Sequence, residues 1–212
     1  MDIEILKENI FLEKYKLFSI DSSYNKEEYV RVYHGYLNRR VCLEAYKSEA
    51  VIINAELKIA IPNSYPFAFP KVFFLKKGFP IKLGIDQHVS EDTGLMCLGI
   101  PWEIRKILKK DPSLINIMET LIIPHIAGTI YSIENGGSKY PQGEYSHGTK
   151  GYIEGLEEYF SISLNDNPQK LKELLGFLQS SNNVAKNTLC PFGCGVIYKK
   201  CRCKGNIKPK IS

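Results

Sequence analysis

The 212-residue sequence lacks any run of about 18 consecutive apolar residues, which is the minimum for a membrane-spanning helix. It begins without the basic and then apolar segments of a signal peptide, and it contains no internal repeat. Its apolar fraction of 44% and charged fraction of 24% are those of a soluble domain that buries a core without disulfides. These features predict a cytoplasmic protein that contacts no membrane.

Acidic residues are missing from residues 185–212, which we call the tail and which carry seven Lys and Arg. The net charge of the chain is +5, so the remainder is close to neutral, at about −2 by charge counting. The basic tail therefore indicates either a solvated segment or contact with an acidic partner. Few aromatic residues lie between these bases, so we do not expect nucleic acid as a partner.

Cysteine is scarce outside the tail, where only Cys42 and Cys97 occur. Cys42 falls in a predicted strand and is interpreted as a small buried residue. The other four cysteines lie within fourteen positions, and in a cytoplasmic chain such a cluster favours a metal site over disulfides. Four thiolates in a glycine-containing loop can form a tetrahedral structural zinc site, and the spacing resembles a SEC-C-type zinc motif with its second cysteine displaced. The alternative is a reduced tail without metal. The predicted zinc ligands are Cys190, Cys194, Cys201 and Cys203.

The hydrophobic pattern predicts an α+β fold, a four-stranded antiparallel meander flanked by helices. Apolar residues at helical spacing indicate one helix over residues 3–18. Short connections between the β-like segments favour antiparallel pairing of neighbours, and the first strand is expected to end near Asn38. The predicted strands are residues 29–37, 41–46, 51–61 and 72–75.

A helix is predicted to begin at Pro112, with Asp111 as its N-cap. Its apolar run over residues 114–130 is expected to be buried. Pro124 is expected to kink or divide this helix. His125 lies within the apolar run and is interpreted as a core histidine with satisfied polar atoms. Two further helices are predicted, over residues 149–160 and from residue 167.

Two segments carry unusual chemistry or geometry. Three prolines within residues 62–70 exclude a helix and a central strand, and they predict a rigid corner with aromatic rings packed beneath it. In residues 86–102, Cys97 follows a glycine and an apolar pair, and His88 lies nine residues upstream. Cys97 is either a core residue or an exposed nucleophile.

These two segments together resemble the ubiquitin-conjugating enzyme family. The family's proline pattern is matched by Ile61, Pro62, Tyr65, Pro66, Phe67, Pro70, Val72 and Phe74. Its Gly-x-x-Cys-Leu active-site pattern is matched by residues 94–98, and Trp102, interpreted as packing that shapes the loop, follows. The family's His-Pro-Asn is absent, and His88 stands near the position of the asparagine.

The resemblance covers residues 1–135, which would form the conjugating domain, and it implies a conjugating activity. The sequence pattern assigns residues 136–182 to a glycine-rich loop with a helical extension and residues 183–212 to the zinc-binding part. Cys97 would carry a protein's C-terminal acyl group as a thioester and pass it to an amine. His88, or His147 in the glycine-rich loop, would stabilise the oxyanion or accept a proton.

The segment 143–148 resembles divergent prokaryotic members, including those encoded in anti-phage CBASS operons beside a cyclic-nucleotide synthase. For that subgroup the implied partners are a protein with a C-terminal glycine, with the synthase as modifier or target, and an activating enzyme. Two alternatives remain at this point. One is a non-catalytic protein-binding module on the same fold, and the other is a cysteine hydrolase that uses Cys97 with His88 or His147.

Overall fold

The computed structural model describes residues 3–42, 50–75, 88–136, 140, 145–146, 148–160, 163–164, 167–179 and 200. The chain divides into two compact units, residues Met1–Glu144 and Tyr145–Ser212. The four cysteines predicted to bind zinc and the histidine of the glycine-rich loop, His147, lie outside the described residues.

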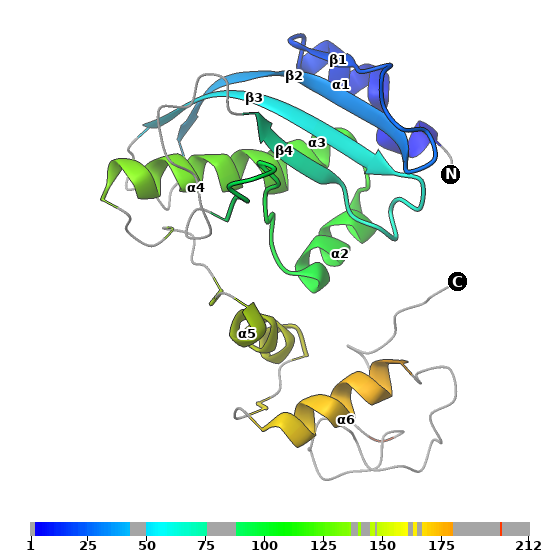
Figure 1. Cartoon of the computed structure of the whole chain (residues 1–212), viewed down its shortest axis with the longest axis vertical. Helices are drawn as coiled ribbons and strands as arrows, with labels where there is room; N and C mark the ends of the chain where they lie inside the picture. Colours follow the sequence, from blue (N-terminus) through cyan, green and yellow to red (C-terminus); the bar gives the residue numbers. More distant parts are fainter. Residues whose placement is uncertain are drawn as a thin grey trace. The chain divides into compact units, whose positions relative to one another are not determined.

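The first unit is built on a four-stranded antiparallel sheet in the order β1-β2-β3-β4 (Figure 1). This order is that of a meander, and the predicted α+β class with four antiparallel strands is confirmed. The pairing of β2 with β3 is the longest, from Tyr29 opposite Pro62 to Cys42 opposite Ala50. The strands are β1 (Phe18–Ile20), β2 (Tyr29–Cys42), β3 (Ala50–Pro62) and β4 (Lys71–Leu75).

The prediction that the strand beginning at Tyr29 ends near Asn38 was wrong. Asn38 pairs with Asn54, and β2 continues without a break through residues 41–42, which had been assigned to a separate strand. Backbone hydrogen bonds along a sheet do not depend on side-chain polarity, so a polar run can remain in a strand when its partner strand continues. Cys42 is exposed at the end of β2, so its predicted burial is also corrected.

The predicted helix over residues 3–18 is shorter than expected. It consists of a 3-10 turn, η1 (Ile3–Leu6), and α1 (Glu8–Lys14), and the chain then enters β1 at Phe18. Phe18 pairs with Gly35 of β2, where a Cβ atom would overlap the backbone of the β1 segment. The missing side chain at Gly35 therefore allows β1 to approach β2 closely at this point.

The helical part of the unit follows the cysteine segment. It comprises α2 (Pro101–Lys110), α3 (Leu114–Ile117), a π-helical turn η4 (Met118–Ile122) and α4 (Ile123–Glu134). The helix is not divided near Pro124, but it contains the π-helical turn just before this residue, because proline cannot donate the backbone hydrogen bond of a regular α-helix. The predicted N-cap was wrong by two residues. Ser113 caps α3 and accepts the amide of Asn116, while the Asp111 carboxylate accepts the amide of Ser113.

These helices supply the second layer of the core. Figure 1 shows α4, in green, lying along one face of the sheet, and residues from both layers share one buried cluster. The continuous helix Leu114–Glu134 is long and apolar enough to cross a membrane by length and composition, but 61% of its most apolar window is buried within the protein. Such burial is typical of the core helix of a globular domain.

The proline corner between β3 and β4 is tied to the helical layer through Tyr65. Tyr65 is buried beneath it and donates a hydrogen bond to the carbonyl of Pro112, which ties the corner to the start of α3. Phe69 packs against the core, whereas Phe67 is exposed. The expectation that the rings pack beneath the corner therefore holds for Tyr65 and Phe69 and not for Phe67.

The second unit contains two described helices, α5 (Gly148–Phe160) and α6 (Pro168–Gln179), which agree with the predicted helices. Asn167 caps α6 by accepting the amides of Gln169 and Lys170. Glu154 of α5 accepts hydrogen bonds from the amide and hydroxyl of Ser146.

Candidate active site

Residues 88–97 form a tight hairpin, which we call the cysteine hairpin. Val89 and Met96 form a β-bridge, and the amide of Ser90 donates to the carbonyl of Leu95 over 2.9 Å. At its open end the Cys97 amide donates to the carbonyl of His88 over 2.7 Å. The hairpin therefore brings together two residues that are nine positions apart in the sequence.

The cysteine hairpin is fixed to the edge strand β4. The Met96 amide donates to the carbonyl of Val72 and the Phe74 amide donates to the carbonyl of Gly94, both over 2.8 Å. Gly94 has φ +71°, and a Cβ atom there would overlap the carbonyl oxygen of Phe74. Glycine is required at this position both for the left-handed backbone and for the close approach to β4.

Side chains alternate between the core and the surface along the second arm of the hairpin. Met96 is buried in the core cluster, while its neighbours Leu95 and Cys97 are exposed. This is the period of a β-strand, and the burial of Met96 anchors the arm with the thiol of Cys97 facing outward. Of the two readings of Cys97, the structure favours an accessible thiol over a core residue.

The thiol of Cys97 lies in an environment that favours the thiolate. Its side chain is hydrogen-bonded to His88, and this bond is the main cause that lowers the pKa of Cys97 below its ordinary value. Burial of the thiol acts in the opposite direction, while the amide of Gly99 and the charge on His88 lower the pKa further. A lowered thiol pKa increases the fraction of the nucleophilic form at neutral pH.

His88 adopts an uncommon left-handed backbone conformation, with φ +53°. Non-glycine residues with positive φ are rare, and a small group including Asn and His accepts them most readily. In this conformation the carbonyl of His88 receives the Cys97 amide while its side chain contacts the Cys97 thiol. His88 is thus joined to Cys97 through both its backbone and its ring.

Two further rings surround His88 and were not expected from the sequence. The ring centroid of His88 lies 5.4 Å from that of Tyr140 and 6.2 Å from that of His125. Tyr140 is buried, and its hydroxyl is hydrogen-bonded to Thr129 of α4 over 2.9 Å. We call Cys97, His88, His125 and Tyr140 the thiol cluster.

His125 is only half-buried as a residue, and it is not the satisfied core histidine that the sequence suggested. Its Nε2 atom is fully buried and has no hydrogen-bond partner among the residues that the structure describes. Burial lowers the pKa of His125 to about 4, with a further contribution from the charge on His88. The signal in the sequence was a polar ring within an apolar helix, but its direction toward His88 depends on the tertiary fold.

The remaining predicted site residues fall on parts of the chain that the structure does not describe. His147 and the four tail cysteines are outside the described residues, and so is the side chain of Trp102 in α2. Within the described ranges, no group of three or more His, Cys, Asp or Glu side chains is arranged to hold a metal ion. The zinc site therefore stays a prediction from the sequence.

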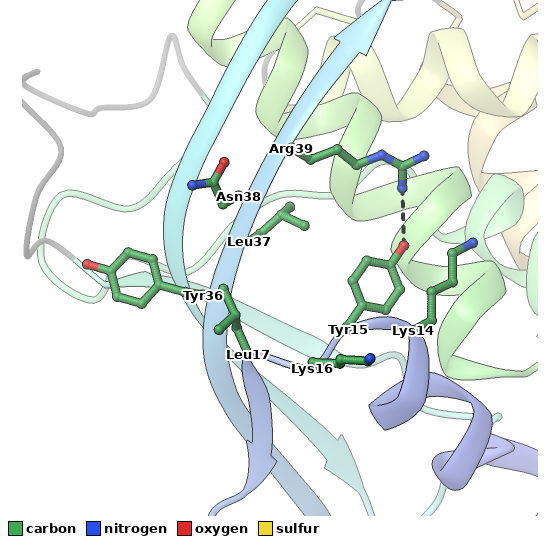
Figure 2. Close-up of a pocket in the computed structure, with 8 residues that line it drawn as sticks. All are labelled: Lys14, Tyr15, Lys16, Leu17, Tyr36, Leu37, Asn38 and Arg39. Carbon is green, nitrogen blue, oxygen red and sulfur yellow. Dashed lines mark hydrogen bonds between the residues drawn. The ribbon is translucent and has the colours of Figure 1, made fainter.

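A pocket of about 220 Å³ lies elsewhere on the first unit, beside α1 and β2 (Figure 2). Figure 2 shows the hydroxyl of Tyr15 directed at the guanidinium of Arg39, which donates to it over 3.3 Å. Arg39 and Lys14 are also paired with Glu119 of η4. The pocket wall contains neither cysteine nor histidine, so it is separate from the Cys97–His88 pair. Its lining residues are Lys14, Tyr15, Lys16, Leu17, Tyr36, Leu37, Asn38 and Arg39.

Comparison of the chain with protein-family models, curated proteins and solved structures gives no match.

Proposed function

We propose that this chain is a ubiquitin-conjugating-enzyme-like acyl carrier that holds a protein's C-terminal acyl group as a thioester on Cys97 and passes it to an amine. The observation that carries the proposal is the exposed Cys97 thiol, hydrogen-bonded to His88 at the end of a hairpin fixed to a four-stranded meander. An exposed thiol in the family's Gly-x-x-Cys-Leu pattern, downstream of the proline corner, also supports it.

The loading step needs a thiolate that is accessible to a large partner. The Cys97 sulfur attacks the thioester carbonyl of an incoming acyl group, a new carbon–sulfur bond forms, and the donor sulfur leaves as a thiolate. The hydrogen bond from His88 favours the Cys97 thiolate for this attack. No net oxidation or reduction occurs, so no redox partner is required.

The transfer step needs a proton acceptor for the incoming amine. The amine nitrogen attacks the carbonyl carbon, the carbon–sulfur bond to Cys97 breaks, and the proton lost by nitrogen passes to His88 and then to solvent. The same ring can donate a hydrogen bond to the oxyanion that forms on the carbonyl oxygen. His88 thus takes the place of the family's missing asparagine in this proposal.

The experiment uses a glycine-ending peptide activated as a small-molecule thioester, which loads the carrier without an activating enzyme. The full chain is mixed with this peptide and run on non-reducing and reducing gels. We expect a thiol-sensitive adduct with the wild-type chain and with Cys42→Ser, which removes the other described exposed cysteine. Cys97→Ser should give no thiol-sensitive adduct, and any adduct it forms should be an oxygen ester that resists thiols.

The same cysteine–histidine pair also suits a cysteine hydrolase, which is the second candidate. The two differ in the acceptor. A carrier accumulates the adduct and discharges it faster when free lysine is added, whereas a hydrolase releases the free peptide acid with repeated turnover and no lysine dependence. Formation of no adduct and no acid would favour the non-catalytic binding module.

The wider role follows from the resemblance and belongs to the same proposal. The modifier is a protein that ends in glycine, a cyclic-nucleotide synthase of an anti-phage operon is the modifier or target, and an activating enzyme supplies the acyl group. The four tail cysteines would hold a structural zinc ion, whose tetrahedral thiolate coordination would organise the tail.

A further inference from the structure

His125 presents the least expected polar atom in the first unit. Its Nε2 is fully buried in α4 without a hydrogen-bond partner among the described residues. An unpaired buried polar atom destabilises the folded state, so native proteins seldom retain one without a reason. An apolar side chain of similar size would fill this position in the core without that cost.

The position of the His125 ring gives a reason for retaining its buried nitrogen. The centroid of His125 lies 6.2 Å from that of His88, at an interplanar angle of 69°, and 6.4 Å from that of Tyr140. His88 and Tyr140 also meet edge to face, at 5.4 Å and 73°. The buried polar atom is thus part of a cluster of three rings, one of which is hydrogen-bonded to the Cys97 thiol.

The distance between the two histidine rings decides how they interact. A direct nitrogen–nitrogen hydrogen bond requires about 3 Å, and centroids 6.2 Å apart hold the ring nitrogens farther apart than this. One bound water spans such a separation, and a polar recess with two or more hydrogen-bonding groups is the environment that holds one. The three neighbouring rings carry groups of this kind, the nitrogens of the two histidines and the hydroxyl of Tyr140.

We propose that His125 is a positioning residue for His88, and that its buried Nε2 holds the His88 imidazole against the Cys97 thiol through one bound water. Its importance for acyl transfer rests on the function proposed above, whereas the contact itself is tested without any acyl donor. In this arrangement Tyr140, fixed by its hydrogen bond to Thr129, packs edge to face against the ring of His88.

In this arrangement His125 stays neutral and does not accept or release a proton near neutral pH. Its pKa of about 4, set by burial and by the charge on His88, keeps its ring uncharged at neutral pH. The titratable groups that face it among the described residues are His88 and the phenol of Tyr140. A neutral polar partner stabilises the charged form of His88, and a charged His88 in turn favours the Cys97 thiolate.

Two substitutions in the full chain separate polarity from packing. His125→Phe keeps a planar ring and removes the polar atom, while His125→Gln places an amide near the position of Nε2. The readouts are the titration midpoint of His88, followed by ¹H–¹⁵N NMR of the imidazole, and the pH dependence of Cys97 alkylation by iodoacetamide.

We expect His125→Phe to lower the His88 midpoint and to raise the Cys97 midpoint, each by about half to one pH unit. His125→Gln should restore at least half of both shifts. Unchanged midpoints in a folded His125→Phe protein would overturn the proposal, and so would equal shifts in both variants, which would mean that only packing matters.

A measurement on the wild-type chain keeps the proposal testable if His125→Phe does not fold. The ¹⁵N shifts of His125 should show one neutral tautomer with Nε2 hydrogen-bonded, and this state should persist to about pH 5. A mixture of tautomers without a hydrogen bond at Nε2 would contradict the proposal. These outcomes do not depend on thioester formation, so failure of the proposed function is seen separately in the peptide-thioester assay.

Discussion

At the scale of single residues, the account depends on how His88 is tied to Cys97. The sequence was sufficient to single out both residues, because a glycine, an apolar pair and a family pattern surround the thiol. The sequence did not predict that the carbonyl and the ring of His88 are both hydrogen-bonded to Cys97, since these contacts follow from the register of the cysteine hairpin. For the same reason the proximity of His125 to His88 was missed, and the expectation of a satisfied core histidine was wrong.

The first prediction concerns the ionisation of Cys97. We expect His88→Asn to raise the thiol pKa, because the hydrogen bond and the charge of the imidazole both lower it in the wild-type chain. Asparagine tolerates the left-handed backbone of His88, with φ +53°, so the hairpin should persist. The iodoacetamide rate of Cys97 at pH 7 should fall roughly three- to tenfold, and the midpoint of its pH profile should move upward.

Cys42 supplies the control within the same molecule, since it is also exposed and lies far along the chain in β2. Its alkylation rate should not change in the variant. An unchanged Cys97 profile together with a native fold would show that His88 does not activate the thiol.

At the scale of elements, the cysteine hairpin positions the thiol because it is hydrogen-bonded to β4. We expect Gly94→Ala to disturb this attachment, because the new Cβ atom would overlap the carbonyl of Phe74 and the residue would keep a φ of +71°. Backbone strain of about 1–2 kcal/mol and overpacking of about 1–3 kcal/mol should both reduce the free energy of unfolding. Cys97 alkylation should also change.

Gly136 provides the matched control for this substitution. It has nearly the same φ, +72°, but a Cβ atom there meets nothing within 4 Å. Gly136→Ala should therefore lose only the backbone term, about 1–2 kcal/mol, and should leave Cys97 reactivity unchanged. Equal losses measured by urea unfolding for both variants would contradict the attachment of the hairpin as the cause.

A second element-scale feature joins α1, β2 and the π-helical turn η4. Glu119 of η4 accepts hydrogen bonds from Tyr15 and Arg39 and pairs with Lys14 over 2.6 Å. Burial alone would raise the pKa of Glu119, but the hydrogen bonds from Arg39, Lys14 and Tyr15 outweigh it and lower the pKa to about 2. The folded-state pKa is below the ordinary value of 4.5, so the ionised form contributes stability that is fully present above about pH 4.5 and is lost as the pH falls toward 2.

We expect Glu119→Gln to reduce the free energy of unfolding at pH 7 by about 1–2 kcal/mol, because the network is partly exposed. The variant should also lose less stability than the wild-type chain between pH 4.5 and pH 2, as measured by urea unfolding. Glu13→Gln, on the exposed surface of α1, is the control and should do neither. A loss at pH 7 that is the same for both variants would contradict the network.

Helices and strands were predictable where their bounds follow from the local sequence pattern, and less so where their bounds depend on pairing between strands. The antiparallel pairing of β2, β3 and β4 and the helices α5 and α6 followed from periodicity and turn residues. The continuation of β2 through Asn38 and the strand β1 did not, because they depend on pairing with β3 and on the close approach of β1 to Gly35. The π-helical turn before Pro124 was anticipated only as a kink or division.

At the scale of the whole molecule, the chain consists of a nearly neutral part, residues 1–184, and the basic, cysteine-rich tail. We expect the purified full chain to contain one zinc ion, measured by elemental mass spectrometry, because four thiolates suit tetrahedral coordination. Replacing Cys194 and Cys203 by serine should abolish zinc binding, while Cys42→Ser should not. Zinc in neither the wild-type chain nor the control would contradict the tail assignment.

The central claim is that Cys97 is the acyl carrier. Its most direct test is site-resolved mass spectrometry of the full chain after mixing with a glycine-ending peptide thioester. The account predicts the peptidyl group on Cys97, absent from Cys42, and its release as a lysine amide when free lysine is added. Acylation of both exposed cysteines to the same extent, or no acylation of Cys97, would contradict it.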